Sequence, residues 1–237
     1  MVLKAVLLDL SGIIINDRLI HRELIDELLL AENLQPQGKK VNQLSIERDS
    51  RSHLQKLWQS QGRFLSDESL DKLVIKKAKS YTQKLEQIVT LPIYPEVIQF
   101  IDRIRSDGYK LALVTNSVQS EVQTVLKRCE IDRYFDTIVT GAETSQTNLD
   151  PASHLVAIKR LNQLNPDLKL LPSECLAIEH TFARLKAVKS VGIQAVAIAH
   201  TYPFHMLQRR ANWTIDSFAD LELDRITKYF NPPTLIS

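Results

Sequence analysis

The sequence predicts an α/β fold, a doubly wound parallel sheet with a helical segment inserted after its first strand. Two observations predict the sheet. Short apolar runs without polar alternation recur along the chain, as in strands that are buried on both faces. Helical patterns separate these runs, and strand–helix–strand alternation favours parallel connections. A third observation predicts the insertion, because residues 16–90 show helical periodicity and no strand pattern.

Five runs are expected to form the strands. Each is short and rich in Val, Ile, Leu and Ala, so both of its faces are expected to pack against helices. The runs are Lys4–Leu10, Lys110–Thr115, Thr137–Thr140, Cys175–Glu179 and Ala195–Ala199.

Four helices are expected between these strands. The first begins at Pro95 and ends at Gly108, where the end of a helix favours a left-handed residue. In the third, Leu155, Ile158 and Leu161 are expected to share one buried face. The second, third and fourth helices are expected at Ser117–Arg128, Pro151–Leu164 and Thr181–Val191.

Residues 16–90 are expected to form a separate small helical domain, and residues 1–15 and 91–237 the main domain. One apolar helix face consists of Leu24, Ile25, Leu28 and Leu29. Another consists of Leu70, Leu73, Val74, Tyr81, Leu85 and Ile88. The last helix also carries four lysines, which form either a solvated surface or a basic patch that faces a substrate. They are Lys72, Lys76, Lys77 and Lys79.

Composition and charge narrow the class of protein. The 237 residues are 44% hydrophobic and 24% charged, which is typical of globular proteins. A formal net charge of +2 gives no electrostatic reason to expect nucleic-acid or membrane binding, and no apolar run reaches the roughly 18 residues of a membrane span. The two cysteines, Cys129 and Cys175, lie far apart, and Cys175 is expected to be a buried thiol. These features favour a cytoplasmic location.

Polar residues stand where three of the predicted strands end. Because the carboxyl ends of parallel strands share one edge, close to helix N-termini, these residues are expected to converge. Two interpretations remain open: an anion-binding site, or a set of helix caps. The residues are Asp9 and Ser11 after the first strand, Thr115 and Asn116 after the second, and Glu179 and His180 at the fourth.

Four segments carry motifs in a familiar order. They are Leu8–Gly12 with Asn16 and His21, then Leu113–Ser117, then Gly141–Pro151, and last Cys175–Thr181. Together they resemble the motifs of haloacid dehalogenase superfamily phosphatases, and the resemblance covers nearly the whole chain. The sequence is most similar to the β-phosphoglucomutase-like and sugar-phosphate phosphatase group. The resemblance implies a Rossmann-like core, with the helical insertion as a cap domain.

The resemblance also implies catalytic roles, which this chain keeps only in part. The family's first aspartate attacks phosphorus, and Asp9 retains it. Its second aspartate, an acid and base, is replaced by Ser11, which puts general acid–base help of roughly 10²–10⁴-fold at risk. At the position of the family's lysine, the alignment places Asn148, a neutral amide. The implied phosphate-binding residues are Thr115, which is also implied as a catalytic residue, and Asn116, with Arg184 as a further candidate.

The implied metal site is incomplete as well. The family holds Mg²⁺ between the nucleophile, a backbone carbonyl and an acidic pair, which here corresponds to Asp9, Glu179 and His180. Imidazole suits transition metals better than Mg²⁺. His180 is therefore either a transition-metal ligand or a hydrogen-bonding replacement in a site without metal. The sequence alone predicts no cofactor, and the resemblance implies Mg²⁺ if the chain is an active enzyme.

Charge balance decides what these losses mean. Two unit charges about 4 Å apart interact by roughly 4 kcal/mol at an effective dielectric of about 20. Repulsion of that size between Asp9 and a phosphate would cost about three decades of rate. Arg184 stands where the family motif has a small glycine. It either reaches the site and supplies positive charge there, or lies on a helix surface.

Two functions follow from the residues and the resemblance. The first is a binding or regulatory protein with little or no Mg-dependent phosphatase activity. The alternative is an active phosphate-monoester hydrolase of the sugar-phosphate class that forms an aspartyl-phosphate on Asp9. The expected partner is a small phosphorylated molecule or a protein, with no nucleic acid and no membrane.

Overall fold

Six parallel strands form one sheet in the order β3-β2-β1-β4-β5-β6. The structure is a computed structural model, and it describes residues 2–36, 50–143 and 151–230. β1 lies at the centre between β2 and β4, and every neighbouring pair is parallel. The strands are β1 Ala5–Leu8, β2 Lys110–Val114, β3 Thr137–Val139, β4 Cys175–Glu179, β5 Gln194–Ile198 and β6 Trp213–Ile215.

The five expected strands are therefore confirmed, β4 with the expected bounds and the others with ends that differ by one or two residues, and β6 is an addition. β6 has three residues, and two of them, Trp213 and Thr214, are only half-buried. A short strand at the edge of a sheet lacks the apolar run that marks a central strand. This explains why the sequence did not predict it.

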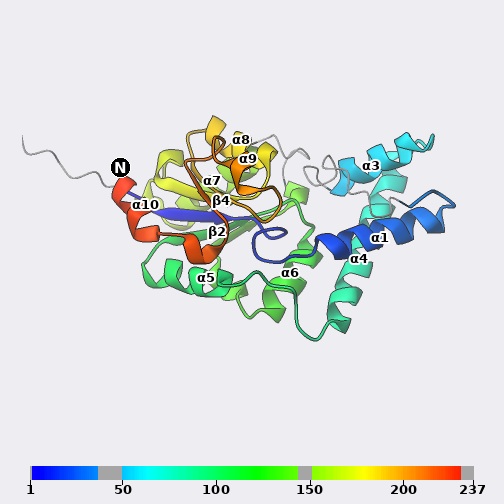
Figure 1. Cartoon of the computed structure of the whole chain (residues 1–237), viewed down its shortest axis with the longest axis horizontal. Coiled ribbons are helices and arrows are strands. Elements are labelled where there is room, and N and C mark those ends of the chain that lie inside the picture. Colours follow the sequence, from blue (N-terminus) through cyan, green and yellow to red (C-terminus); the bar gives the residue numbers. More distant parts are fainter. Residues whose placement is uncertain (1, 37–49, 144–150, 231–237) are drawn as a thin grey trace, which may run out of the picture.

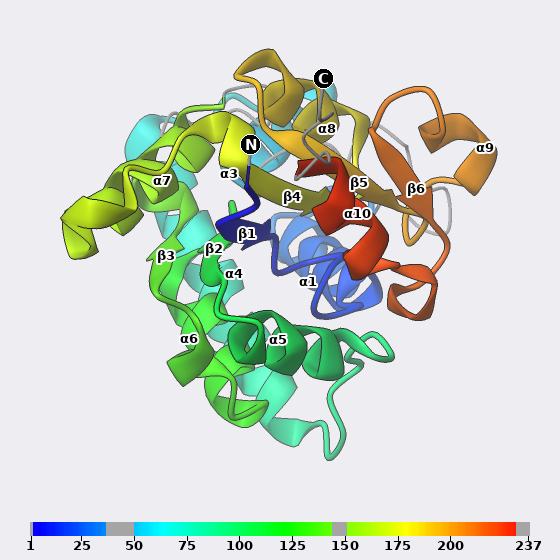
Figure 2. The same ribbon diagram turned by 90° about the vertical axis from the view of Figure 1, so that its left-hand side faces the viewer.

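Helices cover both faces of the sheet (Figure 2). Alternate residues of β1 point to opposite faces, so Val6 and Leu8 pack in one cluster and Ala5 and Leu7 in the other. The first face is covered by α5 Val97–Ser106, α6 Gln119–Arg128 and α10 Leu223–Phe230. The second is covered by α7 Ala152–Leu164, α8 Phe182–Ser190 and α9 Phe204–Leu207.

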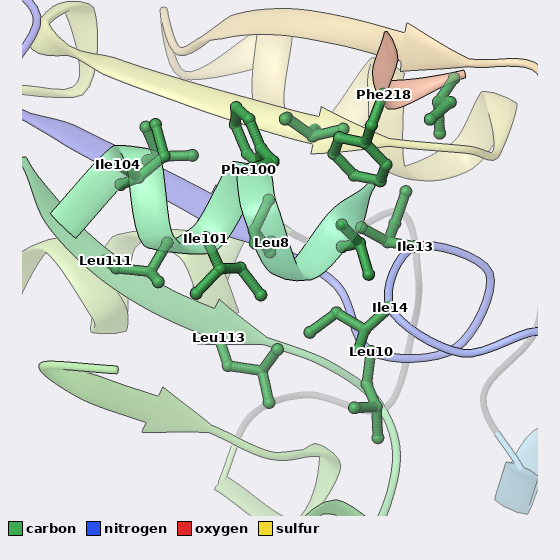
Figure 3. Packing of buried hydrophobic residues seen from close by; sticks show 14 of the residues in the cluster. Leu8, Leu10, Ile13, Ile14, Phe100, Ile101, Ile104, Leu111, Leu113 and Phe218 are labelled. Atoms are coloured by element: carbon green, nitrogen blue, oxygen red, sulfur yellow. The ribbon is translucent and has the colours of Figure 1, made fainter. Parts of the chain in front are cut away.

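The packing between sheet and helices is dominated by aliphatic side chains. On the α5 face, Phe100, Ile101 and Ile104 lie against strand residues such as Leu8 and Leu113 (Figure 3). The opposite face uses smaller side chains, among them Ala112 and Ala177, so helices can approach more closely there. No described helix is both long and apolar enough to cross a bilayer.

One expectation about α7 is wrong. Leu155 was expected on its buried face but is 40% exposed, whereas Ile158 and Leu161 are buried as expected. The buried face begins instead with Ser153 and His154. The first turn of α7 thus points polar groups inward, toward the ends of the strands.

Directly after β1, three helices of the described residues lie together (Figure 1), and they pack around a hydrophobic cluster of their own. They are α1 Arg18–Ala31, α3 Ser50–Ser60 and α4 Asp67–Gln87. The cluster surrounds the buried Trp58 and includes Leu28, Leu54 and Leu70. The two chain segments that connect these helices to the sheet run side by side, because Ile15 forms an antiparallel bridge with Ile93. The expected apolar face of α1 is confirmed, since all four of its residues are buried.

The contact between α4 and α6 contains a buried ion pair. Lys77 Nζ lies 3.0 Å from Glu121 Oε1, and both side chains are almost fully buried. Lys77 is therefore neither part of a solvated surface nor part of a basic patch, and the expectation for this lysine is wrong. The i, i+4 spacing on α4 places Lys77, Tyr81 and Leu85 on the same buried face.

Five short 3-10 turns complete the described chain. They lie in connections between strands and helices. They are η1 Asp132–Tyr134, η2 Gly141–Glu143, η3 Pro166–Leu168, η4 Pro172–Glu174 and η5 Phe218–Asp220.

Candidate active site

The expected convergence at the carboxyl edge of the sheet is present. Asp9 follows β1, Thr115 follows β2, and Glu179 ends β4. These three strands are adjacent, so their ends place three polar side chains together. All three residues are buried. Buried polar groups at such a place require partners, and these partners define the site.

Arg184 connects the strand ends. It lies in the first turn of α8, which begins after Thr181, the residue whose hydroxyl accepts a bond from the Arg184 backbone N–H. Its Nε lies 2.7 Å from Glu179 Oε2 and 3.1 Å from Asp9 Oδ2. Its Nη2 donates to the carbonyl of Val114 at 2.7 Å. The helix-surface interpretation of Arg184 is therefore wrong.

Burial and charge act against each other at Arg184. Burial lowers the pKa of its guanidinium, but Asp9 and Glu179 outweigh burial and raise the pKa above its ordinary value. The side chain thus stays positively charged. Since a buried charge without a partner is strongly unfavourable, the two carboxylates and the guanidinium form one structural unit.

His154 holds the second oxygen of Glu179. Its Nε2 lies 2.9 Å from Glu179 Oε1, and its side chain is almost fully buried. Burial lowers the pKa of His154, with a further decrease from Arg184, so the ring is neutral near pH 7. A neutral ring whose Nε2–H donates to Glu179 is the tautomer that this contact favours. Burial alone would raise the pKa of Glu179, but Arg184 and His154 lower it to about 2.

The sequence analysis did not place His154 in the site. A signal was available, since His154 stands four residues before Ile158 and seven before Leu161, on the helix face that was expected to be buried.

The donor set does not fit Mg²⁺. This ion requires near-octahedral coordination by oxygen, mostly carboxylates and water. The guanidinium of Arg184 donates a hydrogen bond to Glu179 Oε2 and forms an ion pair with Asp9 Oδ2, and His154 hydrogen-bonds the remaining oxygen of Glu179. Among the described residues, no group of three His, Cys, Asp or Glu side chains could hold a metal ion.

Asp9 and Glu179 lie on either side of one fixed cation. Together they carry two negative charges, and Arg184 carries one positive charge. A guanidinium therefore lies between the two carboxylates that correspond to the implied metal site.

Ser11 is bonded to a carboxylate that the sequence did not single out. Its hydroxyl donates to Asp17 Oδ1 at 2.5 Å. Tyr81 donates to Asp17 Oδ2 at 2.7 Å, and His21 Nε2 lies 3.2 Å from the same oxygen. Asp17 occupies the N-cap position of α1, yet its side chain does not cap the helix and bonds these three groups instead.

Asp17 is ionised although it is only 1% exposed. Burial alone would raise its pKa, but the charge and hydrogen bond of His21, with the hydrogen bonds of Ser11 and Tyr81, hold the pKa below its ordinary value. Hydrogen bonds to charged groups contribute about 1.5–3 kcal/mol each. The Ser11 hydroxyl is therefore firmly oriented toward Asp17.

His180 serves as a hydrogen-bonding group in this structure. Its Nδ1 lies 2.6 Å from the hydroxyl oxygen of Thr201. Burial is the main reason that its pKa is lowered, so the ring is neutral. Its ring packs on Gly12, where a Cβ would lie only 2.4 Å from the ring, so only glycine fits. The positive φ of Gly12, +80°, favours glycine as well.

The second strand end is a turn built around Thr115. Thr115 Oγ1 accepts a bond from the backbone N–H of Ser117 at 3.2 Å, which leaves the Thr115 hydroxyl proton able to point elsewhere. Asn116 is half-buried next to it, and its carbonyl lies close to Gly141, where a Cβ would come within 2.5 Å. Asn148, the residue at the expected lysine position, lies outside the described residues.

Comparisons with known proteins identify the family of this chain. The family model of haloacid dehalogenase-like hydrolases matches residues 3–192. Protein CbbY of Rhodobacter capsulatus is 26% identical over 223 residues, which is 91% of this chain and 93% of CbbY. A phosphoglycolate phosphatase of Mannheimia succiniciproducens is 28% identical over 162 residues, 68% of each chain.

A solved structure has the same fold. The β-phosphoglucomutase of Clostridium difficile superimposes with a TM-score of 0.82 at 20% identity and covers 98% of both chains. The match of the family model to most of the chain, together with the sheet order and the position of Asp9 after the first strand, shows that this chain belongs to the haloacid dehalogenase-like hydrolase family.

Proposed function

We propose that this chain is a phosphate-monoester hydrolase that works without a divalent cation. Asp9 acts as the nucleophile, and Arg184 supplies the fixed positive charge beside it. The observation that carries this proposal is the ion pair of 3.1 Å between Arg184 Nε and Asp9 Oδ2. Membership of a hydrolase family with phosphatase relatives supports the reaction class.

The reaction has two displacements at phosphorus. One Asp9 oxygen attacks phosphorus, the bond to the leaving oxygen breaks, and an aspartyl-phosphate forms. Water then attacks the same phosphorus and releases phosphate and the Asp9 carboxylate. Thr115 and Asn116 are suited to bind phosphate oxygens, because both stand at the end of β2 directly beside Asp9.

Electrostatics decides whether the first displacement is feasible. Asp9 and a phosphate about 4 Å apart would repel by roughly 4 kcal/mol at an effective dielectric of about 20. Arg184 contacts Asp9 directly and is locked by Glu179 and Val114, so it offsets this repulsion without reorganisation. Preorganised charge is most of what phosphoryl transfer requires.

We further propose that residues 16–90 act as a cap domain over the core formed by residues 1–15 and 91–237. The separate hydrophobic cluster of α1, α3 and α4 supports this division. The cap would select a small phosphorylated molecule. A solved CbbY from Rhodobacter sphaeroides, 18% identical with a TM-score of 0.80, contains xylulose-1,5-bisphosphate, which makes sugar phosphates a reasonable part of any substrate panel.

A second candidate is a non-catalytic protein that binds a phosphorylated ligand and regulates a partner. One specific observation favours it. Both Asp9 oxygens are already engaged: Oδ1 accepts a hydrogen bond from the backbone N–H of Leu10 at 2.7 Å, and Oδ2 forms the ion pair with Arg184 Nε. A carboxylate held in this way can keep the residues around a bound ligand in place without attacking the ligand.

The test is hydrolysis of a broad panel of phosphomonoesters by the purified protein, with a chelator or with excess Mg²⁺. The panel includes sugar, aryl and acyl phosphates. We expect equal turnover in both buffers and its loss in Asp9→Asn. The matched control is Asp102→Asn, the same change at an exposed position of α5, which should keep full activity.

The outcomes separate the two candidates. Turnover that requires Mg²⁺ would contradict the proposal. Absence of turnover, together with saturable binding of phosphate esters in calorimetry, would favour the non-catalytic candidate. Absence of both would contradict both candidates.

A further inference from the structure

The direction of one proton limits the chemistry of this site. A serine hydroxyl has one proton to donate and two lone pairs that accept. Ser11 directs its proton to Asp17 Oδ1, and the other Asp17 oxygen accepts from Tyr81. Because Asp17 is an ionised carboxylate, it can only accept, so the proton on this contact belongs to Ser11.

Toward the rest of the site, Ser11 Oγ can therefore act only as a hydrogen-bond acceptor. Ser11 is two residues beyond Asp9 and half-buried, while Asp17 is fully buried behind it. A water molecule near Asp9 can donate to Ser11 Oγ. A leaving oxygen cannot receive a proton from Ser11 unless the bond to Asp17 breaks, which would leave a buried carboxylate with one donor fewer.

Other described groups at this edge do not replace the missing acid. His180 and His154 are neutral, and a neutral imidazole is a very weak acid near pH 7. The guanidinium of Arg184 keeps its proton. The hydroxyl of Thr115 is no stronger an acid than the alcohol that would leave.

We propose that Ser11 and Asp17 form a pair that accepts protons only, and that the substrates are phosphates whose leaving group departs as a stable anion. These are acyl, enol and aryl phosphates rather than simple alkyl phosphates. The inference rests on the proposed hydrolase function and names its substrate class.

The two halves of the reaction balance as follows. In the first, the Asp9 oxygen bonds to phosphorus and the leaving group departs as an anion that takes its proton from solvent. In the second, water oxygen bonds to phosphorus as one water proton moves to Ser11 Oγ and the Ser11 proton moves to Asp17. The bond between phosphorus and Asp9 breaks, phosphate leaves, and Asp17 returns its proton to solvent.

The experiment is a single-turnover measurement of leaving-group release along a series of decreasing acidity. Acetyl phosphate, 4-nitrophenyl phosphate, phenyl phosphate and glycerol phosphate form the series. We expect release to slow steeply along it, with glycerol phosphate slower by at least the roughly 10²–10⁴-fold that a general acid contributes.

Two variants test the roles of Ser11 and Asp17. Asp17→Asn should leave the first release from 4-nitrophenyl phosphate within about tenfold and slow steady turnover by roughly 10²-fold or more. Exchanging the two side chains, Ser11→Asp with Asp17→Ser, keeps the pair's composition and returns a carboxyl group to the site. This exchange should accelerate release from glycerol phosphate by roughly 10²–10⁴-fold.

The matched control is Thr82→Val on α4, one residue beyond Tyr81 but outside this network, which should follow the native series. Release that does not depend on the leaving group would contradict the inference alone. Equal effects of Asp17→Asn on both steps would also contradict it. No release from any member, acetyl phosphate included, would contradict the inference and the proposed function together.

Discussion

The two sides of the candidate site replace lost family residues in different ways. On the side of β4 and α8, Arg184 takes the place of a cation between Asp9 and Glu179. On the side of α1 and α4, a carboxylate appears at Asp17, one hydrogen bond behind Ser11. The first replacement is made within the core. The second depends on Tyr81, which belongs to the inserted helices.

This difference shows which part of the site is held by the core alone and which part depends on the inserted helices. Arg184 contacts Asp9, Glu179 and Val114, which all belong to the core, so these contacts do not involve the inserted helices. Asp17 shares its donors between the core and α4, so its geometry requires α4 to stay against α6. The buried pair Lys77–Glu121 and the contact of Tyr81 with Asp17 hold α4 in this place.

The largest effects, on activity and on stability, are expected from a change at Arg184. Arg184→Leu should lower kcat/KM by about three decades or more, because Asp9 then meets phosphate without a cation. It should also lower the free energy of unfolding by about 3–5 kcal/mol, since Asp9 and Glu179 remain buried without their partner. Enzyme kinetics and urea unfolding measure the two effects. Arg225→Leu, at an exposed arginine of α10, is the control and should change neither.

The next effect concerns how α4 is held. Lys77→Met should lower the free energy of unfolding by about 3–5 kcal/mol, because Glu121 is left buried without a partner. Adding Glu121→Leu should recover most of this loss, since both charges are then absent. Urea unfolding of the single and double variants measures this. Equal destabilisation in the two would mean that lost packing, and not an unpaired charge, is responsible.

A smaller effect is expected at the link between α4 and Asp17. Tyr81→Phe removes a hydrogen bond to a buried carboxylate and should cost about 1.5–3 kcal/mol of unfolding free energy. It should also reduce the second displacement more than the first, because Ser11 and Asp17 lose part of their orientation. Burst kinetics with 4-nitrophenyl phosphate separate the steps. If both steps changed equally, the two sides of the site would not differ as described.

The smallest effect near neutral pH is expected in the pH dependence of the free energy of unfolding, which changes mainly in acid. The pKa of Glu179 is lowered to about 2 in the folded chain, from an unfolded value of 4.5. The stabilisation from this carboxylate is therefore complete above about pH 4.5 and is lost as pH falls toward 2, by on the order of 3 kcal/mol. Asp17, whose pKa is lowered as well, adds to the loss in the same direction. Thermal unfolding between pH 2 and 7 measures it, and Glu179→Gln should flatten the curve at its acid end.

The sequence predicted the fold well because the fold depends on patterns that are local in sequence. Buried strands and helix punctuation are read from neighbouring residues, and the convergence of Asp9, Thr115 and Glu179 follows from parallel topology. The partners of these residues were harder to predict. The sequence suggested Arg184 as a possible site residue but did not suggest His154. Both side chains reach the site because of the direction in which their helices point them, and that direction depends on the phase of each helix.

Asp17 illustrates a second reason. Its sequence position suggests a helix cap, and nothing local indicates that Tyr81, 64 residues away, will donate to it. From the sequence alone, the lost Mg²⁺ ligands and the lost lysine can be counted. The position of a guanidinium between the remaining carboxylates cannot be predicted in this way, because it depends on tertiary packing.

The central claim is that Arg184 supplies the charge that Mg²⁺ supplies elsewhere in the family. Calorimetric titration of Mg²⁺ into the native chain and into Arg184→Gly with His180→Asp tests it most directly. We expect no binding heat for the native chain, and saturable binding once the guanidinium is gone and a second carboxylate is present. Stoichiometric Mg²⁺ binding by the native chain, abolished by Asp9→Asn, would contradict it.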